Sequence, residues 1–259
     1  MQNLQVLLTF DLEEFDIPLE YGLQIDWEEQ IEVGKTGMNT LSDLLDFHKI
    51  NTTLFTTATY AVHNKPQLSC LSNSHEIASH SYYHSSFQEK DLINSKLVLE
   101  EITNKKVTGL RMPRMKQVSM EAVRKAGYLY DASVNPTYIP GKYNNFNLPL
   151  KPYKENNVYR VPCSVFSALR FPLFWLAFKN ISYALYKQLA IQTLKKTGIL
   201  HLYFHPWEFA DISQYKLPIY IKRHSGRALV ERLDCLINDL KKEASFSTIN
   251  NFLADQTHF

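Results

Sequence analysis

Cysteine is scarce in this sequence, and its spacing excludes two common kinds of site. The 259 residues include three cysteines, Cys70, Cys163 and Cys235. They are widely separated and form no CxxC pair, which argues against a zinc knuckle and against a thioredoxin-like redox motif. Three widely spaced cysteines are typical of free, buried thiols in a reducing compartment.

Long apolar runs and an excess of charge of one sign are also missing. The longest charge-free apolar run of note, FPLFWLAF at residues 171–178, is far shorter than the roughly 20 residues that a membrane-spanning helix needs. The formal net charge is +2, which gives no electrostatic basis for binding nucleic acid or an anionic membrane. The first 15 residues have no basic region and acids interrupt their apolar stretch. We therefore expect no signal peptide and a soluble, cytoplasmic protein.

Strand and helix patterns alternate from one end of the sequence to the other. Apolar, β-branched stretches predict strands, and apolar residues near helical spacing predict the helices between them. This alternation predicts one α/β domain over residues 1–259, with parallel strands in an open wound sheet or a barrel. Strands are expected within 4–14, 51–60, 75–84, 107–113, 157–165 and 199–209 and just after Gly127, helices within 37–49, 88–105, 120–126, 174–198 (one or two) and 226–244, and a long loop at 136–157.

Acids, histidines and arginines follow the predicted strands at their carboxyl ends. In parallel α/β folds, chemistry gathers at this end of the sheet, so these side chains predict a pocket. The residues in question are Asp11, Glu13, Glu14, His80, His84, Arg111, Arg114, Asp131, His205 and Glu208.

The stretch IASHSYYHSSF places His80 and His84 four residues apart. On a helical turn, two such rings lie on one face and can reach one ion, although most histidine pairs are ordinary core or surface residues. Two histidines with one carboxylate form a catalytic zinc pattern that leaves a position for water. A second acid can then accept the proton of that water. Glu14 and Asp16 can instead be solvent-facing loop acids or helix caps, and we favour that interpretation for Asp16.

Residues at two other strand ends can support such chemistry. Arg111 can hold a carboxylate in a fixed, ionised orientation, whereas Arg114 suits a surface role equally well. His205 can donate a proton to a leaving group. Trp207 can form the wall of a sugar-sized pocket or simply pack, and Glu208 can orient His205 or cap the next loop.

Six segments, taken in order, resemble the polysaccharide deacetylase family, that is, the NodB-like domains of carbohydrate esterase family 4. The resemblance spans most of the chain and includes the branch that has an HPWE ending. TFDLEE resembles the first motif, usually TFDD, and HSYYH resembles the H-[ST]-x-x-H metal motif. The remaining segments are RMPR, similar to the third motif, and YDASVNP, RVPCS and YFHPWEF, similar to later segments.

The resemblance implies a distorted (β/α) barrel with about seven parallel strands, a divalent ion, most often Zn²⁺, and removal of N-acetyl groups from sugars. By position, it implies that His80 and His84 bind the metal and that Asp11 is the general base. It further implies that Arg111 orients Asp11 and that His205 is the general acid.

The first motif departs from the family pattern. Leu12 stands where a second aspartate usually follows the first, and leucine cannot bind a metal. The Asp-x-Asp spacing of some members implies that Glu13 completes the metal site, with Glu14 as the alternative. We also predict substrate contacts from Trp207, Pro113 and Tyr83.

Three functions are consistent with these motifs. The first is metal-dependent removal of N-acetyl groups from an amino-sugar glycan or from its lipid- or nucleotide-linked precursor, the substrate that a cytoplasmic enzyme can reach. The second is metal-independent hydrolysis of a small cyclic amide on the same fold, and the third is carbohydrate binding without catalysis. Residues 171–178 are expected in the core, with an exposed surface for a lipid-linked sugar or the membrane interface as the alternative.

Overall fold

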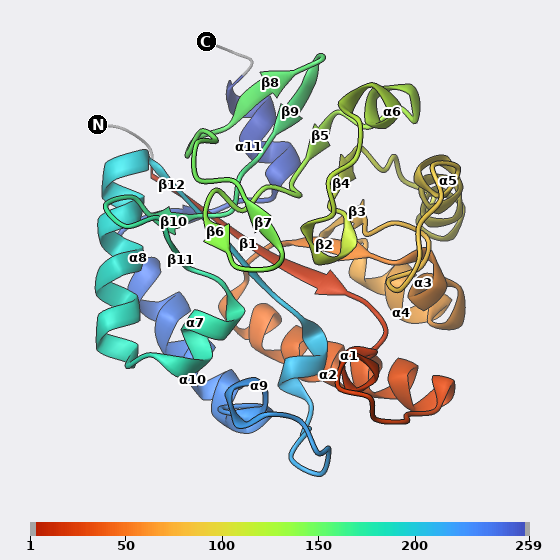
Figure 1. Ribbon diagram of the computed structural model, residues 1–259, viewed down its shortest axis with the longest axis horizontal. Helices are drawn as coiled ribbons and strands as arrows, with labels where there is room; N and C mark the ends of the chain where they lie inside the picture. Colours follow the sequence, from red (N-terminus) through yellow and green to blue (C-terminus); the bar gives the residue numbers. More distant parts are fainter. Residues whose placement is uncertain (1–3, 257–259) are drawn as a thin grey trace.

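The computed structural model describes residues 4–256. A curled sheet forms the middle of the molecule, and seven of its strands run parallel in the order β12-β1-β2-β3-β4-β5-β9 (Figure 1). β8 extends this sheet antiparallel to β9, and β13 pairs with the start of β1. The α/β barrel-like fold with about seven parallel strands is therefore confirmed. The strands are β1 Gln5–Leu12, β2 Thr53–Thr56, β3 Glu76–Ser79, β4 Gly109–Leu110, β5 Tyr130–Asp131, β8 Tyr153–Glu155, β9 Val158–Arg160, β12 Ile199–Phe204 and β13 Ser245–Phe246.

The sheet is closed by a short backbone contact instead of a regular ladder. The chain that leaves β9 passes beside β12, where Ser164 donates its backbone N–H to the carbonyl of His201 at 2.9 Å. The backbone N–H of His201 donates to Ser164 Oγ at 2.8 Å in return. These two bonds complete a barrel whose strands point their carboxyl ends toward one side.

Helices surround this barrel, and two small hairpins lie over its carboxyl end (Figure 1). None of the described helices is long and apolar enough to cross a membrane. The helices are α1 Ile17–Glu20, α2 Trp27–His48, α3 Ala58–His63, α4 Lys65–Leu71, α5 Asp91–Thr103, α6 Met120–Lys125, α7 Trp175–Asn180, α8 Tyr183–Thr197, α9 Ile219–Lys222, α10 Arg227–Leu240 and α11 Ile249–Gln256, with the 3₁₀ turns η1 Pro113–Met115 and η2 Pro206–Phe209. The hairpins pair β6 Tyr138–Ile139 with β7 Tyr143–Asn144, and β10 Val165–Phe166 with β11 Phe171–Pro172.

Several predicted elements need correction. The helix expected at 37–49 begins ten residues earlier, at Trp27. Residues 174–198, expected to form one helix or two, form two and need no correction. The expected loop at 136–157 contains β6, β7 and β8. The histidine pair lies on a loop and not on a helical turn, because β3 ends at Ser79 and Ser81 has a left-handed φ of 66°.

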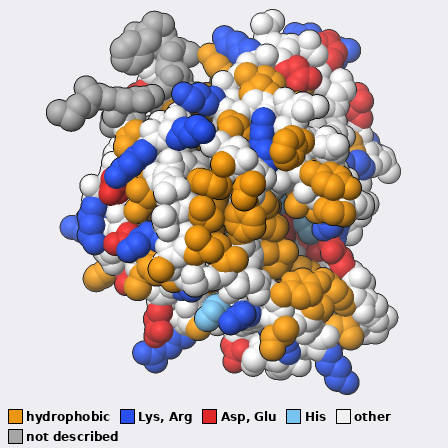
Figure 2. Space-filling model, turned by 60° about the vertical axis from the view of Figure 1, so that its left-hand side comes forward, with side chains coloured by type: hydrophobic (Ala, Val, Ile, Leu, Met, Phe, Trp, Pro, Cys, Tyr) orange, Lys and Arg blue, Asp and Glu red, His pale blue; other side chains and the backbone are white. Residues whose placement is uncertain are grey.

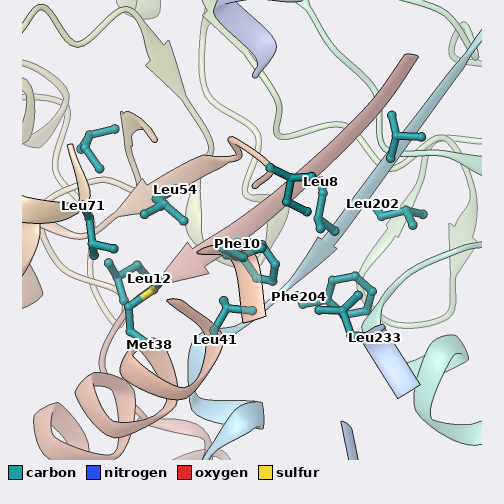
Figure 3. Packing of buried hydrophobic residues seen from close by; sticks show 14 of the residues in the cluster. Leu8, Phe10, Leu12, Met38, Leu41, Leu54, Leu71, Leu202, Phe204 and Leu233 are labelled. Carbon is teal, nitrogen blue, oxygen red and sulfur yellow. The ribbon is translucent and has the colours of Figure 1, made fainter. Parts of the chain in front are cut away.

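The alternation of β1 explains the first motif. Its residues are buried from Val6 onward, and successive side chains of a strand point to opposite faces. Leu12 therefore points outward with Leu8 and Phe10 and packs among Met38 and Leu41 of α2, as Figure 3 shows. Asp11 and Glu13 consequently point to the inside of the barrel, so that the leucine occupies a core position and not a ligand position.

Two glycines of α2 bring that helix against the loops that follow β1 and β12. A Cβ on Gly34 would lie 2.7 Å from the backbone oxygen of Glu13, and one on Gly37 only 1.9 Å from that of Pro206. No real Cβ contact is that short, so both positions need glycine. The helix backbone thus supports both loops directly.

The three cysteines are free, as predicted, but Cys163 alone of the three is buried, and the expectation of buried thiols is wrong for Cys70 and Cys235, which are exposed.

Candidate metal centre

Glu13, His80 and His84 converge at the carboxyl end of the barrel. Glu13 Oε2 lies 3.1 Å from His80 Nε2 and 3.1 Å from His84 Nε2, and all three side chains are buried. Glu13 Oε2 has no hydrogen-bond donor among the described residues. The other oxygen of this carboxylate, Oε1, accepts a hydrogen bond from Trp207 Nε1 at 3.1 Å. One free carboxylate oxygen therefore faces two imidazole nitrogens.

Both histidines are oriented through their other ring nitrogen. His80 Nδ1 lies 2.8 Å from the backbone oxygen of Arg111, and His84 Nδ1 lies 2.8 Å from Asp16 Oδ2. An Nδ1 that donates to such acceptors leaves an Nε2 lone pair directed at Glu13. Three lone-pair atoms facing one point suit a cation, and two imidazoles with one carboxylate suit zinc. The residues present therefore fit the expected ion.

Asp16 is buried, so its interpretation as a solvent-facing acid is wrong, whereas it does occupy the N-cap position of α1, without a side-chain capping bond. Besides His84, it accepts a hydrogen bond from Arg114 Nη2 at 3.0 Å. Arg114 and Met115 both have left-handed φ angles, 53° and 54°. Such angles are unfavourable for residues with a Cβ and tend to occur at functional sites. This loop conformation directs Arg114 toward Asp16.

The charges of the metal-free site balance one another. Burial opposes ionisation of Glu13, but His84, His80 and His205 outweigh burial and hold the pKa of the Glu13 carboxyl well below its ordinary value. Burial likewise opposes protonation of His84, but Glu13 and Asp16 raise the pKa of that imidazole to about 9. A proton on His84 therefore balances Glu13 at neutral pH when no ion is bound.

Glu14, the alternative ligand, is directed elsewhere. Its Oε2 accepts a hydrogen bond from Thr57 Oγ1 at 2.6 Å. Burial raises the pKa of the Glu14 carboxyl above its ordinary value. Glu13 is thus the carboxylate of the first motif that approaches both histidines.

Asp11 is held by a fully buried arginine. Arg111 Nη1 donates to Asp11 Oδ1 at 2.6 Å, and Arg111 Nη2 donates to His201 Nε2 at 2.7 Å. The guanidinium carbon also lies 4.1 Å from the centre of the Phe55 ring. Burial and the charge of Arg111 lower the pKa of His201 to about 3, so this imidazole is neutral and accepts through Nε2. Its Nδ1 donates to the carbonyl of Pro162 at 3.0 Å.

His201 did not emerge from the motifs. Its signal is a single histidine within ILHLYF, a strand that is otherwise apolar except for its tyrosine. A polar residue inside a buried strand needs a partner, and this partner is Arg111.

His205 lies opposite Asp11, with 3.9 Å between His205 Nε2 and Asp11 Oδ2. Glu208 Oε1 accepts from the backbone N–H of His205 at 2.8 Å and lies 3.0 Å from its Nδ1, so Glu208 both orients the imidazole and caps the turn. Burial lowers the pKa of His205, but the bond with Glu208 and the charges of Glu13, Glu208 and Asp11 outweigh it and raise this pKa. On the other side, Glu208 Oε2 lies 3.3 Å from Nζ of the fully buried Lys179. Lys179 was not foreseen, because nothing in its local sequence distinguishes it from a surface lysine.

A cavity of about 340 Å³ opens onto these groups. Trp207 lines it, is 2 % exposed and stacks on His205 with ring centres 5.1 Å apart. Phe174 and Trp175 also line it, whereas Phe178 of the same run is fully buried in the core. The apolar run at 171–178 therefore divides between core and cavity wall.

Two of the residues proposed for substrate binding lie outside the lining of this cavity. Pro113 is buried at the start of η1. Tyr83 is exposed and lines a separate surface hollow with Tyr82. Several aromatic residues that had not been proposed line the cavity instead, namely Tyr21, Tyr143, Tyr203 and Tyr220.

Residues 5–130 match the sequence model of the polysaccharide deacetylase family. No curated protein matches the sequence. Among solved structures, a "putative polysaccharide deacetylase" from Mycobacterium smegmatis superposes with a TM-score of 0.66 at 17% identity, over 97% of this chain and 90% of that one. The Puue allantoinase gives 0.64 at 13% identity, over 95% and 88%.

A CE4 family pseudoenzyme from Bacillus anthracis gives a TM-score of 0.53 at 14% identity, over 96% of this chain and 65% of that one. At such identities these three likenesses concern the fold. Residues 5–130, which carry the first three motifs, are thus similar to the polysaccharide deacetylase family, and the whole barrel shares its fold with the solved structures.

Proposed function

We propose that the protein is a metal-dependent hydrolase that removes N-acetyl groups from an amino sugar and releases acetate. The observation that carries the proposal is the approach of Glu13, His80 and His84 to one point next to an acid–base pair, Asp11 and His205, whose side chains are 3.9 Å apart. Zn²⁺ is the ion that this donor set favours. Bound there, it would polarise the acetyl carbonyl and lower the pKa of a water molecule.

The chain's own residues supply the proton transfers. Asp11 accepts a proton from the attacking water through Oδ2, because Arg111 occupies Oδ1. Arg111 also fixes the orientation of Asp11. His205 donates a proton from Nε2 to the departing sugar amine, and Glu208 holds the opposite ring nitrogen. The raised pKa of His205 favours its protonated form for that step.

We infer that a cavity of about 340 Å³ receives a single sugar rather than the middle of a long polymer. Its lining comes from α1, the β6–β7 hairpin, α7 and α9, which lie around the catalytic groups. Lys142, from that hairpin, adds a positive charge. We infer a terminal amino sugar on a phosphate-containing carrier, lipid- or nucleotide-linked, as the cytoplasmic substrate.

Asp11→Asn tests the assignment of roles. The variant should bind Zn²⁺ with the stoichiometry of the wild type, because Asp11 is not among the three converging ligands, but release acetate from N-acetylglucosamine substrates at least about 10²-fold more slowly. Glu13→Gln is the matched variant, and it should lose the metal. Normal acetate release by Asp11→Asn would contradict the proposed base.

A metal-independent amidohydrolase is the second candidate. It is favoured by the His84–Glu13 pair, which balances the site without an ion. Elemental analysis of the purified protein with activity before and after chelation separates the two. Full activity on a cyclic amide without stoichiometric metal would favour this second candidate, and sugar binding without acetate release in the presence of zinc would indicate a non-catalytic relative.

A further inference from the structure

The mouth of the catalytic cavity is built from loops and short helices that expose apolar side chains. On one side, α1 and α9 are joined by a 2.8 Å hydrogen bond between the hydroxyls of Tyr21 and Tyr220, both of which line the cavity. On the other side lies the β6–β7 hairpin, whose Ile139 also lines it. The β10–β11 hairpin is tied to the segment before β6 by a 2.6 Å bond from Thr137 Oγ1 to the carbonyl of Arg170.

Each of these elements carries a large apolar residue that points into solvent. Ile219 of α9 is 81% exposed and Leu169 between β10 and β11 is 75% exposed, while Leu19 and Tyr138 are about half exposed. We call Leu19, Tyr138, Leu169 and Ile219 the apolar rim. Figure 2 shows hydrophobic side chains above and below a recess that contains histidine and charged side chains.

The position of the rim restricts what can cover it. A folded protein on this surface would close the cavity that the substrate must enter. The two most exposed members, Leu169 and Ile219, are aliphatic and offer no ring for stacking on a sugar. Lys142, which lines the cavity beside the rim, forms no ion pair among the described residues and can attract an anion. An apolar surface with a cationic group suits a lipid whose phosphate precedes its sugar.

We propose that the apolar rim inserts into the surface of a lipid bilayer, so that the cavity receives the amino-sugar headgroup of a phosphate-containing lipid. The identity of the headgroup rests on the proposed function, but the contact with the bilayer does not. Bulky apolar residues around the mouth reach the acyl boundary while the catalytic groups below remain at the level of the headgroups. Lys142 faces the phosphate.

Co-sedimentation of the full chain with phosphatidylcholine vesicles, with and without phosphatidylglycerol, tests the contact. The double variant Leu169→Ser/Ile219→Ser should bind vesicles at least about tenfold more weakly than the wild type, because it lacks two aliphatic side chains that would be buried in the bilayer. The matched control is Phe47→Ser/Leu129→Ser, whose side chains are 76% and 59% exposed but lie at the end of α2 and just before β5, away from the cavity mouth. It should bind as the wild type does.

Acetate release from a water-soluble N-acetylglucosamine substrate is measured on the same three proteins and should be unchanged among them. Wild-type protein that fails to sediment with either vesicle, or equal losses in the rim and control variants, would overturn the proposal. A third outcome is that vesicle binding depends on the apolar rim but the protein releases no acetate from any substrate. This outcome would support the bilayer contact and contradict only the proposed function.

Discussion

The buried ion pair behind His205 makes a prediction whose magnitude follows from its surroundings. Lys179 and Glu208 are both fully buried, their charged atoms lie 3.3 Å apart, and neither Lys179 Nζ nor Glu208 Oε2 has a hydrogen bond to the described residues. Lys179 Nζ also lies within 6 Å of the rings of Trp175 and Trp207. Burial lowers the pKa of Lys179, although Glu208 counteracts this effect.

Lys179→Met removes the only cation beside Glu208 Oε2 among the described residues and leaves this buried oxygen without a partner, while Oε1 keeps its bonds to His205. Breaking such a pair costs about 3–5 kcal/mol of unfolding free energy. Lys179→Met/Glu208→Gln replaces both charges and should recover most of that loss, because exchanging a complete buried pair is often nearly neutral. The double variant loses the carboxylate that orients His205, so it should be stable yet slow.

Urea unfolding, followed by circular dichroism and extrapolated to water, measures these differences. Lys195→Met is the control, because its pair with Glu243 is partly exposed and should contribute at most about 1 kcal/mol. A loss below about 1 kcal/mol in Lys179→Met, or a double variant as unstable as the single one, would refute this account of the pair.

Three further outcomes are expected. Zn²⁺ affinity should rise about tenfold per pH unit up to about pH 9 and then level off, because Zn²⁺ must displace the proton of His84, whose pKa is raised to about 9. Calorimetry in buffers of different ionisation enthalpy should show that about one proton is released on binding. A Zn²⁺ affinity that does not change with pH would contradict this expectation. Gly37→Ala should displace η2, since its Cβ would lie 1.9 Å from the oxygen of Pro206, and lower the melting temperature, whereas Ala at the partly exposed Lys35 should not. Arg111→Lys cannot reach both Asp11 and His201 and should reduce kcat by about 10²-fold; unchanged kcat would show that Asp11 needs no such support.

Much of the barrel can be predicted because its strands are read from continuous apolar stretches. The segments of β1 and β12 show such stretches, each ending in polar residues. The motifs place Glu13, His80 and His84 directly after predicted strands, and therefore at one end of the sheet. The spacing argument expected the two histidines to face one point, which they do, but it assumed the wrong local structure. A loop with a left-handed Ser81, and not a helical turn, brings both rings to Glu13.

The supporting residues could not be predicted in the same way. Asp16, His201 and Lys179 act through partners far away in the sequence, and their roles arise when separate elements pack together. Asp16 reaches His84 68 positions away, and Arg111 reaches His201 90 positions away. Local patterns report which residues are apolar and how they are spaced, but not which buried polar groups face one another.

The central place of β1 in the sheet has a consequence for how the protein is made. β1 lies between β12 and β2, and Thr9 of β1 contacts His201 of β12 across 192 positions of sequence. During synthesis, the edge of β1 that pairs with β12 therefore remains unpaired until the ribosome has added nearly all of the barrel. An apolar strand in that situation is prone to aggregation and is a natural client for chaperones. Asp11 and His205 meet only when this last pairing forms, so a nascent chain stalled before β12 contains the three proposed metal ligands but not the complete proposed acid–base pair.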